Sequence, residues 1–225
     1  MKPINIAIDG PSGAGKSTLA RRIAAKLGYV YVDTGAMYRA IAYYMHTKNA
    51  DSTADIIAQL PNLTVSLSYG EDGVQHVYAN GEDVSDKIRT PEMSMGASKV
   101  SAIPEVREFL LDTQRSLAKQ TSVVMDGRDI GTVVLPDAQV KIYLTASAEM
   151  RAYRRFLELQ EKQPDSAPSY EEVLADVIQR DHQDMTREIA PLKQAEDAVL
   201  ADTGELDLDQ SEALLLQICK ERLQT

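Results

Sequence analysis

Residues 10–17, Gly-Pro-Ser-Gly-Ala-Gly-Lys-Ser, have the types and spacing of a phosphate-binding loop, G-x-x-x-x-G-K-S. The glycines let backbone N–H groups converge on phosphate oxygens without interference from Cβ atoms. The Lys16 ammonium can reach the β- and γ-phosphates, and the Ser17 hydroxyl can bind Mg²⁺. The motif therefore predicts a bound nucleoside triphosphate. It does not identify the acceptor, because GTPase switches, ATP-driven machines and small-molecule kinases share it.

Arginines offer a second set of groups suited to an anionic ligand, because the guanidinium is planar and permanently charged. The chain has thirteen arginines although its net charge is −10. Arg39 and Arg128 each follow the end of a predicted strand, where parallel α/β sheets bind ligands. Others lie on predicted helices: Arg151, Arg154, Arg155, Arg180 and Arg187. A kinase needs such a second anionic site; the alternatives are solvated helix faces and, for Arg180 with Asp184, a surface ion pair.

Two aspartates end apolar stretches close to these motifs. Asp126 closes the run "SVVMD" and could assist Mg²⁺ or its waters, or could cap a turn. Asp9 directly precedes the phosphate loop and could cap it or support it from behind. The three histidines are scattered without metal-ligand spacing, which favours surface or packing roles. The predicted metal site is therefore Ser17 with phosphates and water.

The surrounding pattern predicts an α/β fold. Apolar, β-branched runs at 4–8 and 29–32 alternate with amphipathic helical segments, the first of them over 16–27. Such alternation predicts parallel strands with right-handed crossovers. Further strands are predicted at 122–127, 140–144 and 198–202. We therefore predict a P-loop three-layer sandwich with a central parallel five-stranded sheet.

The alternation of strands and helices is interrupted between residues 62 and 86. There, alternating apolar residues and the turn signal Asn80-Gly81 predict a small antiparallel β insert. Helices are predicted to begin after Thr90 and at Pro104. Ser147 can cap the helix that follows it. After a polar turn at 163–169, Ser169 and Glu172 form a capping box for a helix to about Arg187, and a last helix is predicted over 209–223.

Composition narrows the class of protein. The 225 residues are 44% hydrophobic and 26% charged, which is ordinary for a globular domain. The net charge of −10 argues against an extended nucleic-acid surface, and no apolar run approaches the roughly 20 residues of a membrane span. Cys219 stands alone, so no internal disulfide is possible, and its helical context predicts a buried thiol. We expect a cytoplasmic monomer that binds neither nucleic acid nor membranes.

Several longer stretches occur in a fixed order: IDGPSGAGKST, DTGAMYR, VSDKIRTPE, DGRDIGTVVLPDAQVKIYLTAS, RAYRR and REIAPL. Together they resemble the bacterial cytidylate kinases, over residues 4 to about 203. The resemblance implies transfer of a phosphoryl group from ATP, the co-substrate, to CMP or dCMP with Mg²⁺. It also implies the following division of the chain: a P-loop core at 1–47, 121–150 and 188–225, a monophosphate-binding region at 48–120 with the β insert at about 62–90, and a helical lid with the helix that follows it at 151–187.

The resemblance implies roles for individual residues on the donor side. ATP would contact Gly10, Pro11, Ser12, Gly13, Ala14, Gly15, Lys16, Ser17, Thr18, Arg154 and Arg155. The catalytic residues would be Lys16, Asp126, Arg128, Arg151 and Arg154. The arginines at 151, 154 and 155 would belong to a mobile lid whose closure excludes water.

The same resemblance implies the acceptor site. Arg39, Arg128 and Arg187 would hold the CMP phosphate; Ser98, Arg107 and Asp129 would read the cytosine; Arg180 and Asp184 would hold the ribose; and Thr34 would also contact CMP. Cytosine suits this set because it offers an amino donor to a carboxylate and acceptors to an arginine. Alternatives are a kinase of the same fold with another acceptor, such as UMP, and a GTPase-type switch. The chain lacks the Asn-Lys-x-Asp motif with which such switches read guanine.

Overall fold

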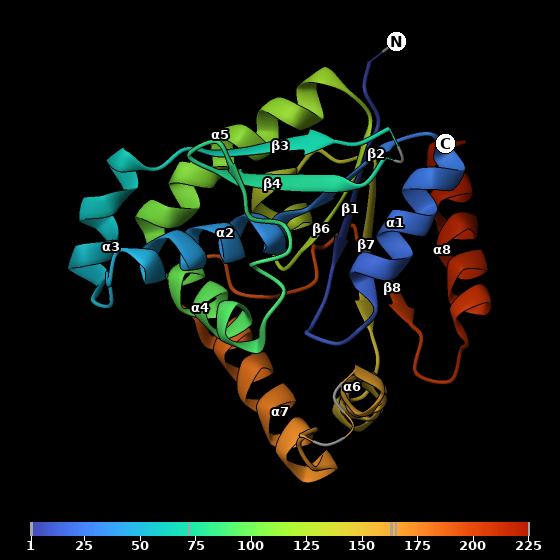
Figure 1. Ribbon diagram of the computed structural model, residues 1–225. Coiled ribbons are helices and arrows are strands. Elements are labelled where there is room, and N and C mark those ends of the chain that lie inside the picture. The colour runs from blue at the N-terminus through green and yellow to red at the C-terminus, as the bar shows by residue number, and fades with distance from the viewer. Residues whose placement is uncertain (1, 72, 163, 165, 225) are drawn as a thin grey trace.

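The computed structural model describes residues 2–71, 73–162, 164 and 166–224. Its centre is a parallel sheet in the order β2-β6-β1-β7-β8, which confirms the predicted five-stranded α/β fold (Figure 1). Each predicted strand lies within one residue of its observed bounds. The strands are β1 (Asn5–Asp9), β2 (Val30–Asp33), β6 (Val123–Gly127), β7 (Val140–Thr145) and β8 (Val199–Asp202).

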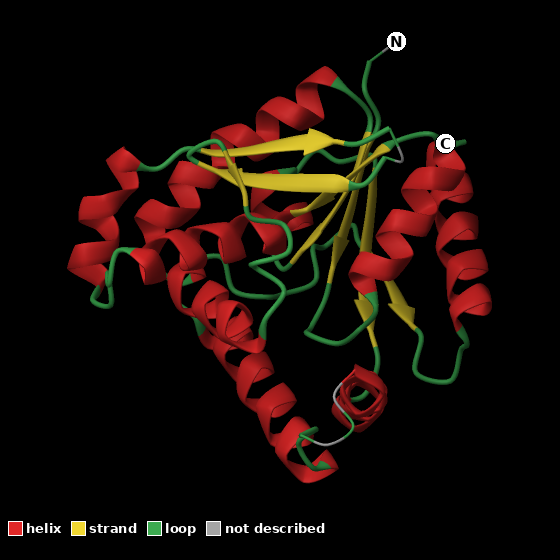
Figure 2. Ribbon diagram, viewed as in Figure 1, coloured by secondary structure: helices red, strands yellow, loops and turns green. Residues whose placement is uncertain are grey.

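Helices cover both faces of this sheet (Figure 2). Successive residues of a strand point to opposite faces, and β1 shows this directly. Ile6 and Ile8 pack toward α1 (Lys16–Leu27) and α8 (Leu208–Leu223), whereas Ala7 packs in a separate cluster with α5 (Pro104–Gln120). Because both faces are buried, β1 and β6 read as continuous apolar runs.

The predicted β insert is confirmed as an antiparallel meander of β3 (Val65–Tyr69), β4 (Gln75–Ala79) and β5 (Glu82–Asp83). Asn80 and Gly81 have φ values of 51° and 81° and form the tight turn between β4 and β5. Residues of the insert share a second core with α2 (Thr34–Thr47) and α4 (Pro91–Ser101). This second core places α4 over the end of the central sheet.

Two helices form the predicted lid region, α6 (Ala148–Lys162) and α7 (Tyr170–Thr186). They pack together around Ala152, Val173 and Val177. Ser169 and Glu172 make the expected capping box at the start of α7. Residues 163 and 165 of the predicted turn lie outside the described residues. The division of the chain into core, monophosphate-binding region and lid stays a prediction.

Three local features were absent from the sequence-based expectation. A short helix, α3 (Thr53–Gln59), begins with a capping box of Ser52 and Asp55 and runs into a 3₁₀ turn, η1 (Leu60–Asn62). A single π-helical turn, η2 (Ile130–Val134), follows β6.

In the part of the chain that the structure describes, no helix has the length and apolar character to cross a membrane.

Candidate active site

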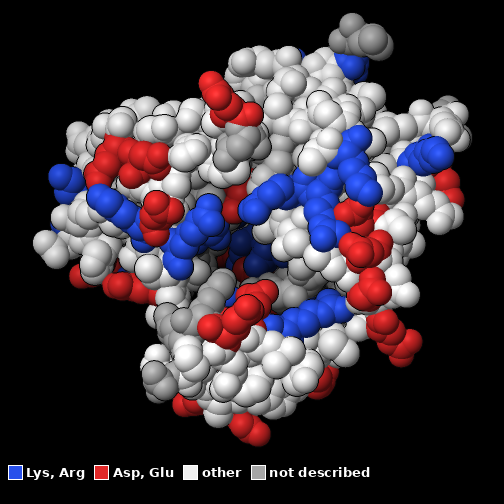
Figure 3. Space-filling model, turned by 45° about the vertical axis from the view of Figure 1, so that its right-hand side comes forward, with Lys and Arg blue, Asp and Glu red and all other residues white. Residues whose placement is uncertain are grey.

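A cavity of about 380 Å³ opens at the carboxyl ends of the central strands. Figure 3 shows basic side chains gathered around a hollow in the surface. Most of the predicted site residues line it: Ser12, Gly13, Gly15, Lys16, Ser17, Thr18, Thr34, Arg39, Ser98, Arg107, Asp126, Arg128, Asp129, Arg154, Arg180, Asp184 and Arg187. Five predicted residues do not: Gly10, Pro11, Ala14, Arg151 and Arg155. The first three belong to the phosphate loop itself, beneath the lining residues.

The phosphate loop is shaped by glycines and left open for an anion. Gly10 has a φ of 152°, and a Cβ atom there would lie 2.0 Å from the carbonyl oxygen of Leu144. Gly15 takes a left-handed φ of 83° at the N-cap of α1, where no side chain caps the helix. The first turn of α1 also lacks an acidic residue. Its N–H groups and positive dipole end are therefore available to a phosphate.

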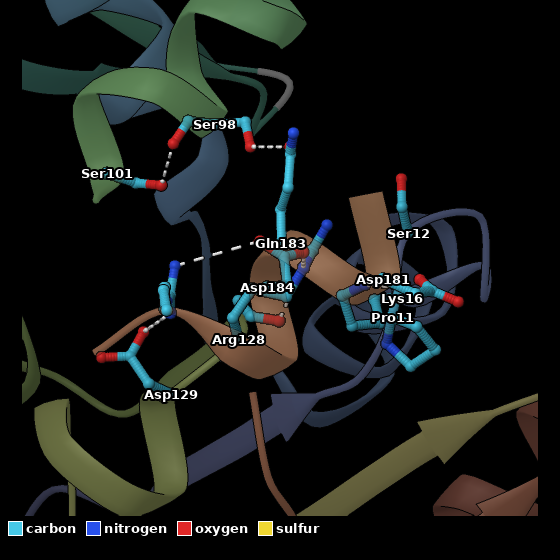
Figure 4. Close-up of polar contacts among 12 residues, drawn as sticks. Pro11, Ser12, Lys16, Ser98, Ser101, Arg128, Asp129, Asp181, Gln183 and Asp184 are labelled. Atoms are coloured by element: carbon cyan, nitrogen blue, oxygen red, sulfur yellow. Dashed lines mark hydrogen bonds and ion pairs between the residues drawn. The ribbon is translucent and has the colours of Figure 1, made fainter. Parts of the chain in front are cut away.

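Lys16 lines the cavity and lies beside Pro11 of the phosphate loop (Figure 4). Its Nζ donates to the carbonyl oxygen of Pro11 at 2.6 Å, and the residue is only 5% exposed. Burial, with the nearby Arg128 guanidinium, lowers the pKa of Lys16 to about 7. A buried ammonium in this position would be stabilised by an anion such as a phosphate group.

Ser17 and Asp126 meet beside Lys16. The Ser17 hydroxyl donates to the Asp126 carboxylate at 2.8 Å, and the Tyr31 hydroxyl donates to the same carboxylate at 3.0 Å. Burial, followed by the negative charge of Asp33, raises the pKa of Asp126 to about 6. Mg²⁺ prefers a few protein oxygens together with phosphate and water. A hydroxyl and a buried carboxylate at the phosphate loop fit that ion.

The half of the cavity away from the phosphate loop is lined by arginines paired with carboxylates. Arg107, from α5, forms a buried ion pair with Asp129. Arg107 also donates to the Ser101 carbonyl at 3.1 Å and lies over the Tyr38 ring, 5.7 Å from its centre. Arg187 approaches Asp129 at 3.7 Å. One carboxylate and two guanidiniums thus lie together below α4.

Arg128 reaches from the end of β6 to Asp184 on α7, with its Nε 2.6 Å from the carboxylate (Figure 4). Arg180 pairs with Asp176 at 3.0 Å, so the alternative of an Arg180–Asp184 ion pair is not realised. Arg39 pairs with Asp33 at 3.0 Å. Each of these three arginines therefore has a counter-charge.

Ser98 faces the same space from α4. Its hydroxyl donates to the Gln183 side chain of α7 at 3.3 Å, and its carbonyl accepts from Ser101 (Figure 4). Thr34 donates from its hydroxyl to the Asp126 carbonyl at 2.7 Å, which ties the start of α2 to the end of β6.

The three arginines of α6 have separate environments. Arg151 is buried and donates to the Ala146 carbonyl at 2.9 Å and the Ser12 carbonyl at 2.8 Å, while pairing with Asp181 at 2.5 Å. Arg154 lines the cavity and donates to the carbonyl of Thr203 at 2.5 Å. Arg155 pairs with Glu158 at 3.1 Å and lines a neighbouring cavity. Arg151 thus joins α6 and α7 to the phosphate loop.

Some residues of the site were not predicted from the sequence. Tyr31 and Asp181 were missed because their partners are distant in the sequence, Asp126 and Arg151. Asp33 had a visible signal, since it stands where the N-cap of α2 is expected, and it accepts from the Ala36 N–H at 2.8 Å. Tyr38 lies within the stretch DTGAMYR, of which only Thr34 and Arg39 were predicted to contact a ligand.

Comparison with known proteins agrees with this geometry. The family model "Cytidylate kinase" matches residues 6–221. A cytidylate kinase of Caldicellulosiruptor saccharolyticus is 53% identical over 212 residues, which cover 93% of this chain and 92% of that protein. A cytidylate kinase of Carboxydothermus hydrogenoformans is 49% identical over 217 residues, with 96% of both chains covered.

Solved structures show the same fold at lower identity. An uncharacterized protein from Eubacterium ventriosum is 12% identical and has a TM-score of 0.54, with 98% of this chain and 99% of that chain covered. Likeness at this level concerns the fold alone. The family follows from the sequence matches over nearly the whole length: the chain belongs to the cytidylate kinase family.

Proposed function

We propose that this protein transfers the γ-phosphoryl group of ATP to CMP or dCMP, giving ADP and CDP or dCDP. One observation carries the proposal: an open phosphate loop and a set of carboxylate-paired arginines share one cavity. A phosphoryl donor and an anionic acceptor can therefore meet without solvent between them. Membership of the cytidylate kinase family supports the choice of acceptor.

On the donor side, residues 10–18 and the N-terminus of α1 are proposed to bind the ATP phosphates. Lys16 compensates charge on the transferring phosphoryl group. Ser17 and Asp126 would hold Mg²⁺ or its waters, and the ion would neutralise further phosphate charge when bound. Arg154 and Arg155 are proposed to contact ATP from the lid.

On the acceptor side, Arg39, Arg128 and Arg187 are proposed to bind the CMP phosphate. Ser98, Arg107 and Asp129 are proposed to bind the base, where the Asp129 carboxylate accepts from the cytosine amino group. Uracil presents a carbonyl oxygen at that position, so the same carboxylate disfavours UMP. Arg180 and Asp184 are proposed to bind the ribose, and Thr34 to contact CMP.

Phosphoryl transfer in this cavity requires exclusion of water. Helices α6 and α7 cover one side of the cavity and carry Arg151, Arg154 and Asp184. We propose that they act as a lid and limit hydrolysis of ATP. We also propose that the protein acts as a monomer in the cytoplasm, without nucleic acid, which its net charge of −10 supports.

A coupled assay of ADP release tests the function, with CMP, dCMP, UMP, AMP or no acceptor. CMP and dCMP are expected to be much better acceptors than UMP and AMP, and ADP release without acceptor is expected to be slow. Comparable turnover of UMP would overturn the cytosine assignment but leave the kinase. Rapid ADP release that no acceptor increases would overturn the kinase assignment itself.

A further inference from the structure

The π turn η2 lies immediately after the residues assigned to the acceptor. Arg128 and Asp129 lead into it, and Asp129 contributes its first carbonyl group. The Val134 N–H donates to the Asp129 carbonyl at 3.1 Å, and the Leu135 N–H donates to the Ile130 carbonyl at 2.7 Å. Single π turns are uncommon and occur mostly at functional sites. Their end groups need partners from outside the turn.

Asp9 supplies the partners at the first end. Its carboxylate accepts from the Ile130 N–H at 2.8 Å and from the Gly131 N–H at 2.7 Å. Asp9 is 5% exposed, and burial raises its pKa to about 6 against the opposing effect of these two hydrogen bonds. Since a buried carboxylate is costly without donors, this geometry is strongly favoured. Asp9 also ends β1, so it connects the strand of the phosphate loop to the turn.

Arg115 supplies the partners at the other end. From α5, its Nε donates to the Val134 carbonyl at 3.0 Å and its Nη2 donates to the Val133 carbonyl at 2.9 Å. The planar guanidinium fixes both bonds in one geometry. Arg107, which pairs with Asp129, lies about two helical turns earlier on the same helix. Helix α5 thus holds the side chain of Asp129 and the far end of the turn together.

Close packing leaves the turn little room to move. A Cβ atom at Gly131 would lie 3.2 Å from Cδ of Lys141 and 3.3 Å from a carboxylate oxygen of Asp9. A Cβ atom at Gly127, at the end of β6, would lie 2.6 Å from Cδ1 of Ile130. The backbone on both sides of Arg128 and Asp129 is therefore closely packed against Ile130, Lys141 and Asp9.

We propose that Asp9 and Arg115 are positioning residues for recognition of the acceptor base. They hold the π turn at its two ends and so fix where Asp129 and Arg128 stand. Neither residue lines the cavity, and the polar groups of both are bonded to the turn instead. The inference rests on the proposed function, in which Asp129 reads the base.

The variants Asp9→Asn, Arg115→Ala and Arg115→Lys test it. The amide introduced by Asp9→Asn would turn an N–H group toward one of the turn's N–H donors, and alanine at 115 would leave two carbonyls without a donor. The KM for CMP should rise and the ratio of kcat/KM for CMP over UMP should fall, each roughly tenfold or more, because small misplacements have such effects. In the Arg115 variants the KM for ATP should stay within about twofold, because the hydrogen bonds of Arg115 go to the turn and not to the phosphate loop. Arg115→Lys, which keeps one donor, should be intermediate.

Lys119→Ala and Asp112→Asn, exposed positions on the same helix, are matched controls. They should leave the base preference at its wild-type value. An unchanged CMP over UMP ratio in a folded Arg115→Ala variant overturns the inference, as does a KM for ATP that rises in parallel with that for CMP. If Asp9→Asn does not fold, the two variants at the half-buried Arg115 still test the positioning role. A wild-type protein without base preference overturns the proposed function, and this inference with it.

Discussion

At the scale of single residues, most arginines of the cavity are paired with carboxylates. Arg107 pairs with Asp129, Arg128 with Asp184, and both pairs are largely buried. An unpaired charge in such surroundings is strongly destabilising. A nucleotide would therefore exchange partners with these groups rather than enter a set of bare charges. The same carboxylates that are proposed to bind the nucleoside hold these arginines in place.

Lys16 is the residue for which the largest effect on turnover is expected. In the variant Lys16→Ala, charge on the transferring phosphoryl group loses its buried ammonium. Loss of one such charge-stabilising donor reduces kcat by about 10²–10³-fold in other enzymes, and a fall of at least that size is expected here. The KM for CMP should change little, because the acceptor groups are separate. Steady-state kinetics measure both constants.

Lys26→Ala, on the same helix but at an exposed position, is the matched control for Lys16→Ala. It should retain wild-type kcat. If Lys16→Ala keeps more than about a tenth of the wild-type kcat, electrostatic stabilisation by Lys16 is not a main contributor.

Cys219 gives a prediction about reactivity and pH. It is 1% exposed on the inner face of α8, and burial raises the pKa of its thiol to about 11. Only the thiolate reacts with disulfide reagents, so the folded protein should resist Ellman's reagent at pH 8, whereas the denatured chain should release one equivalent. Because the folded pKa is raised, the contribution to stability should be constant below about pH 9 and be lost as the pH rises toward 11. Rapid labelling of the folded protein would show instead that α8 opens locally.

The residues of the phosphate loop could be identified from the sequence because their whole function is encoded in eight consecutive positions. The partners of the acceptor arginines could not. Asp184 is 56 residues from Arg128, and Asp129 is 22 residues from Arg107. Spacing along the sequence even suggested an Arg180–Asp184 pair, whereas Arg180 pairs with Asp176, one turn earlier. Several carboxylates lie within reach of one arginine along a helix, and packing determines which of them forms the ion pair.

At the scale of elements, Arg151 connects α6 and α7 to the phosphate loop. The variant Arg151→Met leaves Asp181, whose side chain is 14% exposed, without its cation. Breaking such a pair is expected to destabilise the protein by about 3 kcal/mol or more. The melting temperature should fall, and limited proteolysis between α6 and α7 should become faster. Thermal denaturation and protease digestion measure these changes, with Glu161→Gln on the exposed side of α6 as the control.

The double variant Arg151→Met, Asp181→Leu separates stability from turnover. It removes both charges, so the melting temperature should recover most of its loss. Turnover should be low in the single variant and remain low in the double variant, because in both the carbonyl of Ser12 in the phosphate loop lacks the donor that Arg151 provides. Full recovery of kcat in the double variant would show that Arg151 is needed only to compensate Asp181.

Elements with strong periodicity or explicit caps could be predicted from the sequence, as α1, α5 and the β insert show. The helix α3 was missed because seven residues give too few turns for a clear apolar periodicity. The π turn was missed for a different reason. Its end groups depend on Asp9, 121 residues away from Ile130, and on Arg115 of another element. A conformation stabilised by such distant partners has no local signature.

At the scale of the whole molecule, charge is distributed unevenly. The chain carries a net charge of −10, yet the cavity is lined by Lys16 and six arginines against five carboxylates (Figure 3). A nucleotide therefore meets repulsion from the molecule as a whole and attraction near the cavity. Which of the two dominates depends on the screening length, which is about 30 Å at 0.01 M salt and about 10 Å at 0.1 M salt.

These lengths predict a maximum in the association rate of CMP as salt is increased. A chain of this size has a radius of gyration of about 17 Å, so at about 0.01 M salt the whole negative charge is felt. At about 0.1 M salt only the charges that line the cavity act on an approaching CMP molecule, so association should be faster. Toward about 1 M salt the attraction of these charges is screened as well. Stopped-flow measurement of CMP binding should show this rise and fall, while uncharged cytidine should show neither. A steady decrease from the lowest salt would mean that the field of the cavity dominates at every distance.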